Sequence, residues 1–192
     1  EDSLLTDVLE PTNEPYAIAK IAGIKMCESY NREYGTNYIS AMPTNMYGYG
    51  DNFDLETSHV LPALMRKCHE AKERGDDTFV VWGSGNPMRE FMFSDDLADA
   101  CVYLMNNCNA SEIGSHVNVG TGTDVTIREL AEQICEVVGF SGELVFDSTK
   151  PDGTPRKLLN VNRLRNLGWS AGTSLREGLE KTYAWYLSEH VG

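Results

Sequence analysis

The chain is 192 residues long, and 41% of its residues are hydrophobic while 23% are charged. This composition is typical of a globular protein of one domain or slightly more, and it argues against intrinsic disorder. The formal net charge of −13 argues against nucleic acid and anionic membranes as partners, because both attract clustered Lys and Arg.

The first predicted helix runs from Tyr16 to about Tyr34, after a proline-containing, acidic loop over residues 1–15. Its Tyr, Lys, Gly and Cys residues recur at intervals of three and four, which places them on one helix face. Gly35 ends this helix. A short strand over residues 38–42 follows it.

A long loop rich in Gly and Asn leads to the second predicted helix. Thr57 or Ser58 caps that helix, Pro62 lies in its first turn, and Gly75 ends it. A compact strand over residues 79–82 comes next, because its aromatic and β-branched residues favour a strand.

The remaining predicted elements continue to alternate between strands and helices. A turn over 83–87 leads to a strand over 90–93 and then to a helix that Ser94 or Asp95 caps and that reaches about Asn107. A strand over 117–119 follows, and then a helix that Thr126 caps and Gly139 ends. The last elements are a strand over 144–146, a charged loop over 150–157 and a helix over 174–190. Such alternation predicts an α/β fold with a parallel sheet. The strands are too few for a doubly wound sheet of roughly six or seven, so further strands are expected upstream.

The five cysteines are widely and irregularly spaced and include no Cys-x-x-Cys motif. Neither a disulfide framework nor a zinc site is therefore indicated, and we expect no bound metal. No stretch approaches the about 20 apolar residues of a membrane-spanning helix, and the first residues do not look like a signal peptide. These features predict a cytoplasmic protein.

Tyr16 and Lys20 are one helical turn apart and therefore project from the same face of the first helix. An ammonium group beside a phenol favours the phenolate form, so this pair can donate and accept a proton near neutral pH. Such a pair delivers a proton to a carbonyl that is being reduced. By itself the pattern is weak, because a Tyr four residues before a Lys is also an ordinary surface contact.

Seven segments, of which that pair's is the first, carry a long resemblance between residues 15–185 and a known family. They are Tyr16-Ala17-Ile18-Ala19-Lys20, Met42-Pro43-Thr44-Asn45-Met46-Tyr47-Gly48, Ser58-His59-Val60-Leu61-Pro62-Ala63, Trp82-Gly83-Ser84-Gly85, Met88-Arg89-Glu90-Phe91, Val117-Asn118-Val119-Gly120-Thr121-Gly122 and Lys150-Pro151-Asp152-Gly153-Thr154-Pro155-Arg156-Lys157. On these segments the chain resembles the GDP-L-fucose synthases, which are epimerase-reductases of the extended short-chain dehydrogenase/reductase family. Their activity is NADPH-dependent epimerisation at C3 and C5, and reduction at C4, of GDP-4-keto-6-deoxy-mannose.

The resemblance implies catalytic and cofactor-binding roles for specific residues. Tyr16 would protonate the C4 oxygen, and Lys20 would hold the nicotinamide ribose of NADP(H). His59 would act in the epimerisation, since an imidazole suits proton removal and return, and would also lie beside the cofactor. The loop after the strand would present its backbone to the nicotinamide, through Pro43, Thr44, Asn45 and Met46.

The resemblance also implies four contacts to a GDP-sugar substrate: Lys67, Trp82, Arg89 and Asp152. A planar guanidinium at Arg89 suits bidentate binding of phosphate, and Asp152 can accept hydrogen bonds from a sugar or base. Lys67 fits an ordinary solvated lysine equally well, and Trp82 fits a packed aromatic residue at a strand end.

The resemblance implies the C-terminal part of a Rossmann-like doubly wound sheet together with a smaller α/β substrate-binding domain. Residues 1–50 would belong to the NADP-binding domain and 51–192 mainly to the substrate domain, with about 91–122 returning to the Rossmann-like sheet. The glycine-rich turn that receives the cofactor pyrophosphate is missing from this sequence, as is the family's catalytic cysteine. We therefore expect the C-terminal portion of a longer enzyme, inactive by itself and with an exposed apolar sheet edge.

Two other interpretations stay open at this point. The chain could be a non-catalytic module that binds a nucleotide sugar, or it could come from a related nucleotide-sugar 4-epimerase or 4,6-dehydratase. The Ser58-His59 pair and the charged loop over residues 150–157 favour the epimerase-reductase. Because relatives dimerise through helices beside the catalytic Tyr, we also expect a homodimer through residues 16–34.

Overall fold

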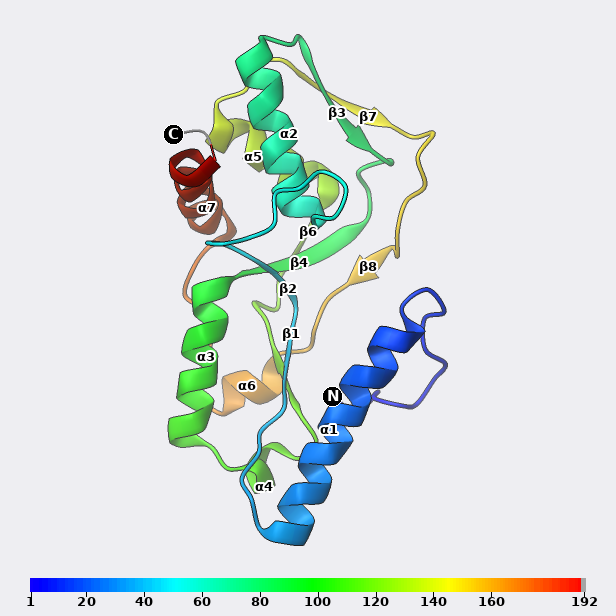
Figure 1. Cartoon of the computed structure of the whole chain (residues 1–192), viewed down its shortest axis with the longest axis vertical. Helices are drawn as coiled ribbons and strands as arrows, with labels where there is room; N and C mark the ends of the chain where they lie inside the picture. Colours follow the sequence, from blue (N-terminus) through cyan, green and yellow to red (C-terminus); the bar gives the residue numbers. More distant parts are fainter. Residues whose placement is uncertain (191–192) are drawn as a thin grey trace.

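The computed structural model of the chain describes residues 1–190, which form an elongated α/β structure (Figure 1). Its helices are α1 (Glu14–Tyr34), α2 (Val60–Arg74), α3 (Ser94–Asn107), α4 (Ala110–Ile113), α5 (Ile127–Val138), α6 (Asn162–Asn166) and α7 (Leu175–His190). Its strands are β1 (Ala41–Pro43), β2 (Asn45–Tyr47), β3 (Thr78–Trp82), β4 (Met88–Phe93), β5 (Val117–Val119), β6 (Asp124–Thr126), β7 (Glu143–Asp147) and β8 (Arg156–Lys157). The predicted α/β class is confirmed.

The strands form three small sheets in which parallel pairing dominates. β1 pairs with β5, and β3 pairs with β7, both in parallel. β4 is central to the third sheet: its second half pairs in parallel with β2, while its first half pairs with β8 in parallel and with β6 in antiparallel. β4 therefore joins segments that are far apart in the sequence.

The buried apolar side chains fall into two clusters at opposite ends of the molecule. One cluster joins α2, α5 and α7 to β3, and Met65, Leu130 and Leu179 lie at its centre. The other joins α3 and α6 to β5, and Leu104 and Leu164 are fully enclosed in it. In Figure 1 the two groups of elements lie at the top and bottom, with β2 and β4 between them.

The helix ends follow local sequence signals closely. Gly35, Gly75 and Gly139 each end a helix in the left-handed conformation, as predicted. Thr126 caps α5 through a capping box in which its hydroxyl accepts from the backbone of Glu129, and the Glu129 carboxylate accepts from the backbone of Thr126.

Two predicted helix caps are wrong. The helix α2 begins only at Val60, so His59 is its N-cap, and the His59 side chain makes no capping hydrogen bond. Thr57 does not cap the helix; its hydroxyl donates to Asp54 in the preceding turn. Phe93 occupies the N-cap position of α3, where β4 runs directly into the helix, so Ser94 is its first residue rather than its cap.

Four strands differ from the predictions, and β6 and β8 are two of them, since no strand was predicted over residues 124–126 or 156–157. The strand predicted over residues 38–42 begins only at Ala41 and includes Pro43. Residues 45–47, predicted to be loop, form strand β2 because they pair in register with residues 91–93 of β4. Local sequence could not reveal this pairing, since the partner is distant in the chain.

Helix α1 is the least enclosed of the described helices, since it alone contains no buried residue, over its 21 positions. Its exposed apolar side chains include Ile18, Met26 and Tyr30, at 53%, 61% and 45% exposure. Strand β1, which follows α1, pairs only with β5 among the described strands, and it exposes Ala41 and Pro43. This open edge agrees with the sheet edge expected from the sequence.

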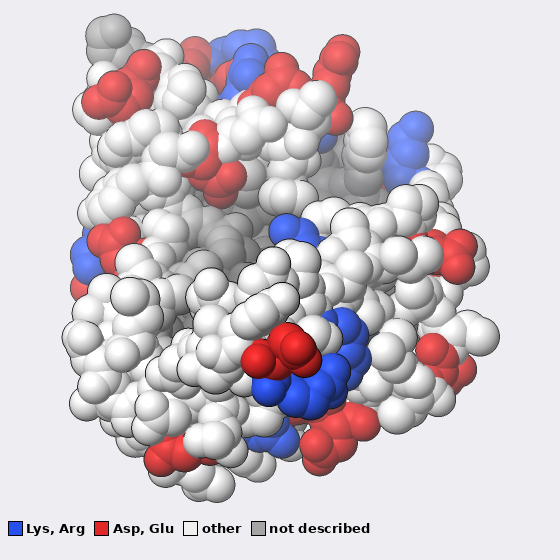
Figure 2. All heavy atoms as spheres, turned by 60° about the horizontal axis from the view of Figure 1, so that its bottom comes forward, with Lys and Arg blue, Asp and Glu red and all other residues white. Residues whose placement is uncertain are grey.

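The surface reflects the acidic composition of the chain. On the face shown in Figure 2, acidic side chains are scattered among uncharged ones, and the basic groups are small. No helix among residues 1–190 is both long and apolar enough to cross a membrane. The five cysteines are free thiols, and the described residues contain no cluster of three or more side chains suited to a metal ion.

Candidate active site

Tyr16 and Lys20 share one face of α1, as their spacing predicts. The Lys20 ammonium lies 5.4 Å from the centroid of the Tyr16 ring. Both side chains are exposed, and the Tyr16 side chain is 66% exposed. The phenol and the ammonium are therefore free to meet a ligand together.

The connection between β1 and β2 is held rigidly by its neighbours. Pro43 is the last residue of β1 and lies opposite Val119 of β5. The Thr44 amide donates to the Val119 carbonyl at 3.0 Å, and the Asn45 side chain donates to the Glu90 carbonyl at 2.7 Å. Met46, in β2, packs on the second apolar cluster. Ligands of open α/β sheets bind at the carboxyl ends of such strands.

His59 is exposed and lies at the N-terminus of α2. Asp51 lies close enough to interact with the charge of His59, and one of its carboxylate oxygens is buried without a hydrogen-bond partner among the described residues. Burial raises the pKa of the Asp51 carboxyl, and His59 acts in the opposite direction. The hydroxyl of Ser58 is also buried and unpaired within the described chain. This turn thus holds polar atoms that have no internal partner.

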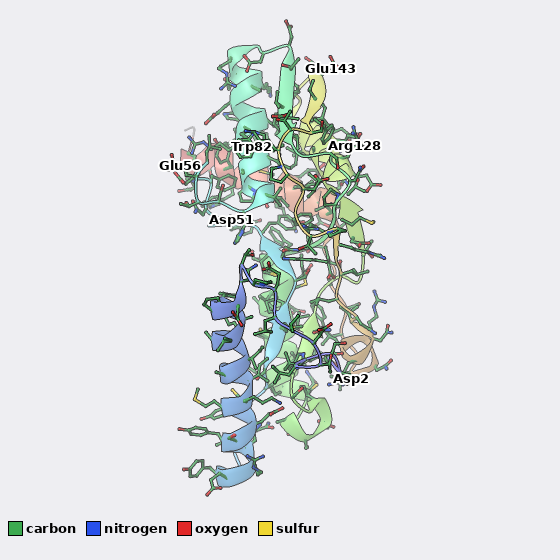
Figure 3. The ribbon with its side chains drawn as sticks, turned by 90° about the vertical axis from the view of Figure 1, so that its right-hand side faces the viewer. Asp2, Asp51, Glu56, Trp82, Arg128 and Glu143 are labelled. Atoms are coloured by element: carbon green, nitrogen blue, oxygen red, sulfur yellow. The ribbon has the colours of Figure 1, made fainter. Side chains whose placement is uncertain are left out.

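Trp82, the last residue of β3, presents its ring to two lysines. The Lys67 ammonium lies 4.5 Å from the ring centroid, and the Lys150 ammonium lies 5.3 Å from it. The Trp82 side chain is 64% exposed, so it is not the packed aromatic considered from the sequence. The stick view in Figure 3 shows Trp82 in the upper part of the molecule, between α2 and the strands β3 and β7. A planar, cationic binding surface results.

Arg89 lies in β4 between β6 and β8, opposite Val125 and Lys157. Burial lowers the pKa of its guanidinium, which donates to the carbonyl of Met88 at 2.7 Å. A β carbon on Gly153 would lie 3.2 Å from the guanidinium, so the loop over residues 150–157 passes close to it. The glycine at 153 keeps this approach open.

Asp152 lies in the same loop, but its carboxylate is bound within the protein. One oxygen accepts from the Ser84 amide at 2.9 Å and the other accepts from the Ser84 hydroxyl at 2.7 Å. These bonds lower the pKa of the Asp152 carboxyl. Asp152 therefore anchors the loop to the turn after β3, and its contact with a substrate stays a prediction.

The cations of this region share one property. Among residues 1–190, no carboxylate forms an ion pair with Lys67, Arg89 or Lys150. Most of the ion pairs that the described residues do form join side chains three or four positions apart or lie on the same helix. In a chain of net charge −13, two such lysines at one aromatic ring, with Arg89 beside the loop that carries one of them, form a local site for an anion.

The predicted residues thus form two groups. Tyr16 and Lys20 lie together on α1, and Lys67 and Trp82 lie together between α2 and β3; no hydrogen bond, ion pair or ring contact within residues 1–190 joins either Tyr16 or Lys20 to His59. Sequence reasoning did not assign roles to Ser84, Glu90 and Lys150. The charge of Lys150 and the position of Glu90 inside an otherwise apolar strand were the available signals.

Residues 1–120 match the model of the NAD dependent epimerase/dehydratase family. The chain is 61% identical over 191 residues to the putative GDP-L-fucose synthase 2 of Arabidopsis thaliana, covering 100% of this chain and 57% of that protein. It is 58% identical over 193 residues to GDP-L-fucose synthase of Escherichia coli, covering 97% of this chain and 60% of that protein.

A solved structure supports the same relationship. A GDP-L-fucose synthetase from Naegleria fowleri bound to NADP is 30% identical, with a TM-score of 0.83, and the match covers 92% of this chain and 56% of that one. The chain thus spans little more than half of the length of the relatives it matches.

Proposed function

The chain belongs to the NAD dependent epimerase/dehydratase family, and on this basis we propose that it forms part of an NADPH-dependent enzyme that converts GDP-4-keto-6-deoxy-mannose to GDP-L-fucose. The observation that carries the choice of substrate is the pair of cations, Lys67 and Lys150, at the exposed ring of Trp82, with Arg89 beside Gly153 of the loop that carries Lys150. A nucleoside diphosphate offers the charge and the planar base that such a surface binds.

The GDP portion would lie on this surface. Arg89 and the two lysines would neutralise the diphosphate, and the Trp82 ring would pack against the base or the sugar. Asp152 would act indirectly, by holding the loop that carries Lys150 and passes Arg89. NADP(H) would lie beside Lys20, His59 and residues 43–46, at the carboxyl end of β1. When bound, NADPH supplies the hydride for reduction at C4.

The chemistry assigned to the chain is proton transfer. Tyr16 would donate its phenolic proton to the C4 oxygen as the ketone becomes an alcohol, and Lys20 would stabilise the resulting phenolate. His59 would take and return a proton next to the ketone, because C3 and C5 are both α to the C4 carbonyl and loss of a proton from either gives an enolate on the C4 oxygen. Asp51, near His59, would keep a protonated imidazole in place.

The domain division proposed from the sequence places residues 1–50 with the cofactor and 51–192 mainly with the GDP-sugar, with about 91–122 returning to the cofactor side. The two apolar clusters support it, because Met92, Leu104 and Val119 belong to one and Met65 and Val81 to the other. The clusters depart from this division at Tyr47, Phe91 and Phe93, which belong to the cluster of Met65, and at Leu164 and Trp169, which belong to the cluster of Leu104.

We also infer a homodimer formed through α1. Its support is the stripe of Met26, Tyr30 and Tyr34, which recur every fourth residue and are all more than two-fifths exposed. A cytoplasmic location is proposed from the free thiols and the need for NADPH.

The deciding experiment follows NADPH absorbance while the protein, in a form as long as its relatives, meets GDP-4-keto-6-deoxy-mannose. Oxidation of NADPH with formation of GDP-L-fucose is the expected result, and Tyr16→Phe should abolish it without weakening the binding of GDP. A 4,6-dehydratase or a UDP-sugar 4-epimerase would leave NADPH unoxidised. Binding of the GDP-sugar without turnover would identify a binding module instead.

A further inference from the structure

Glu90 is a fully buried acid at the centre of the molecule. It lies in β4 directly after Arg89, and its side chain is 0% exposed. No Lys or Arg among residues 1–190 forms an ion pair with it, as the set of ion pairs in the described chain shows. A buried carboxylate without a cation is costly unless hydrogen bonds replace its water.

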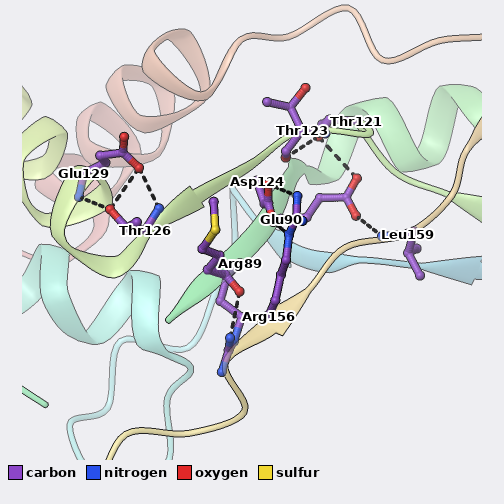
Figure 4. Close-up of polar contacts among 10 residues, drawn as sticks. Arg89, Glu90, Thr121, Thr123, Asp124, Thr126, Glu129, Arg156 and Leu159 are labelled. Carbon is purple, nitrogen blue, oxygen red and sulfur yellow. Dashed lines mark hydrogen bonds and ion pairs between the residues drawn. The ribbon is translucent and has the colours of Figure 1, made fainter. Parts of the chain in front are cut away.

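Three donors from two distant segments replace that water. The Gly122 amide donates to one carboxylate oxygen at 2.7 Å. The Thr121 hydroxyl lies 3.3 Å from the same oxygen and shares its one proton between that oxygen and the Thr123 carbonyl at 3.1 Å. The Leu159 amide donates to the other oxygen at 3.0 Å. Figure 4 shows the carboxylate of Glu90 between Thr121 and Leu159. The side chain thus ties β4 to the loop after β5 and to the segment after β8.

The backbone of Glu90 ties in a third segment. Its carbonyl accepts from the Asn45 side chain at 2.7 Å and from the Thr44 hydroxyl at 3.3 Å. These two residues belong to the connection proposed to flank the nicotinamide. Glu90 therefore links the strand that carries Arg89 to the connection between β1 and β2.

The surroundings of the carboxylate leave no spare room. A β carbon on Gly120 would overlap an oxygen of the Glu90 carboxylate, although the backbone of Gly120 lies outside the left-handed region. The glycine is needed here for space rather than for its backbone freedom. The loop after β5 is thus shaped around the acid.

We propose that Glu90 is a positioning residue, whose buried carboxylate and carbonyl hold Arg89 and Asn45 at fixed places for the GDP-sugar and the nicotinamide. The inference rests on the proposed function, since it concerns the same site. It adds a residue outside the proposed ligand contacts, which holds the side chain of Asn45 and is the chain neighbour of Arg89.

The charge of Glu90 matters because its neighbours are donors. A carboxylate can accept from both amides and the hydroxyl at once, whereas an amide of the same shape must turn one N–H group toward another N–H. Glu90→Gln therefore removes one favourable bond and leaves a buried donor unpaired, while keeping the volume of the side chain.

The test uses the unmodified chain and three variants. Glu90→Gln changes the charge, Gly120→Ala displaces the same carboxylate without changing its charge, and Leu130→Ala is the control. Leu130 is 0% exposed, lies in α5 and takes part in none of the hydrogen bonds of the Glu90 carboxylate, which we call the clamp. Its truncation therefore destabilises the fold without removing a bond of the clamp. Amide exchange of Gly122 and Leu159 and the affinity for GDP are both measured well below the melting temperature.

Both clamp variants should speed exchange of the two amides and weaken GDP binding by about tenfold, the scale expected for a lost charged hydrogen bond. Leu130→Ala should do neither. The proposal is wrong if Gly122 and Leu159 stay protected in Glu90→Gln, or if Leu130→Ala weakens GDP binding equally. If the amides respond as expected but the unmodified chain binds no GDP, the clamp is supported and the proposed function fails.

Discussion

Ser84 holds both carboxylate oxygens of Asp152, one through its amide and one through its hydroxyl. The two residues come from turns 68 positions apart, after β3 and before β8. Their contact brings the loop with Lys150 against the exposed Trp82. The anion site therefore depends on a pair of residues that need not touch the ligand.

Asp152→Asn and Ser84→Ala should weaken GDP binding by similar amounts. Each variant loses a charged hydrogen bond in an exposed loop, so a loss of about three- to tenfold is expected. The double variant should lose little more than either single one, because both break the same anchor. Calorimetric titration with GDP checks this, and additive losses would instead give Asp152 an independent contact with the ligand.

Lys67→Met and Lys150→Met should each weaken GDP binding by about two- to fivefold, the scale of an exposed ion pair. Each should also reduce the sensitivity of the affinity to added salt, because one charge contact is lost. Lys181→Met is the matched control, since that ammonium is already paired with Glu177 at 2.8 Å. An equal loss in the control would argue against a specific anion site.

Met26→Glu should convert the proposed homodimer to monomers. The substitution places a charge on the exposed apolar stripe of α1, where desolvation of a carboxylate opposes association. Light scattering after size-exclusion chromatography measures the mass. Val102→Glu, at a 56% exposed position on α3, is the control and should leave the dimer intact. A monomeric unmodified protein would exclude the proposed dimer.

Gly178→Ala should destabilise the fold although alanine favours helices. A β carbon at position 178 in α7 would overlap the hydroxyl of Tyr47, so we expect a loss of about 1–3 kcal/mol in unfolding free energy. Gly23→Ala in α1 has no neighbour within 4 Å and should cause no loss. Urea unfolding measures both. Tyr47→Phe should relieve part of the effect of Gly178→Ala, and an absence of relief would contradict the overlap.

His116 should make stability depend on pH. Its imidazole is 1% exposed, and burial, with a smaller contribution from Arg163, lowers its pKa below the ordinary value of about 6.5. Protonation therefore favours the unfolded state. The neutral imidazole contributes fully to the free energy of unfolding above about pH 6.5, and this contribution is lost as the pH falls through the pKa that His116 has in the folded protein.

The unmodified chain should therefore lose stability relative to His116→Gln between about pH 7 and about pH 5, by about 1.4 kcal/mol for each unit by which the pKa is lowered. Urea unfolding at several pH values gives the difference between the two proteins. A difference that stays constant over this range would show that His116 titrates normally.

The sequence by itself determined most of the helices and strands. Gly35, Gly75 and Gly139 end helices and Thr126 begins one because these signals act through the residue's own backbone or through bonds within three or four positions. The spacing of Tyr16 and Lys20 likewise fixed their common face, since the helix period alone decides it.

Only the tertiary structure decided which distant residues meet. Strand β2, the bonds of Glu90, the anchor between Ser84 and Asp152 and the approach of Lys150 to Trp82 all join positions tens of residues apart. Such contacts depend on the packing of whole elements, and no local propensity encodes them. The residue types of the candidate site were thus readable in the sequence, while their division into ligand contacts and anchors required the fold.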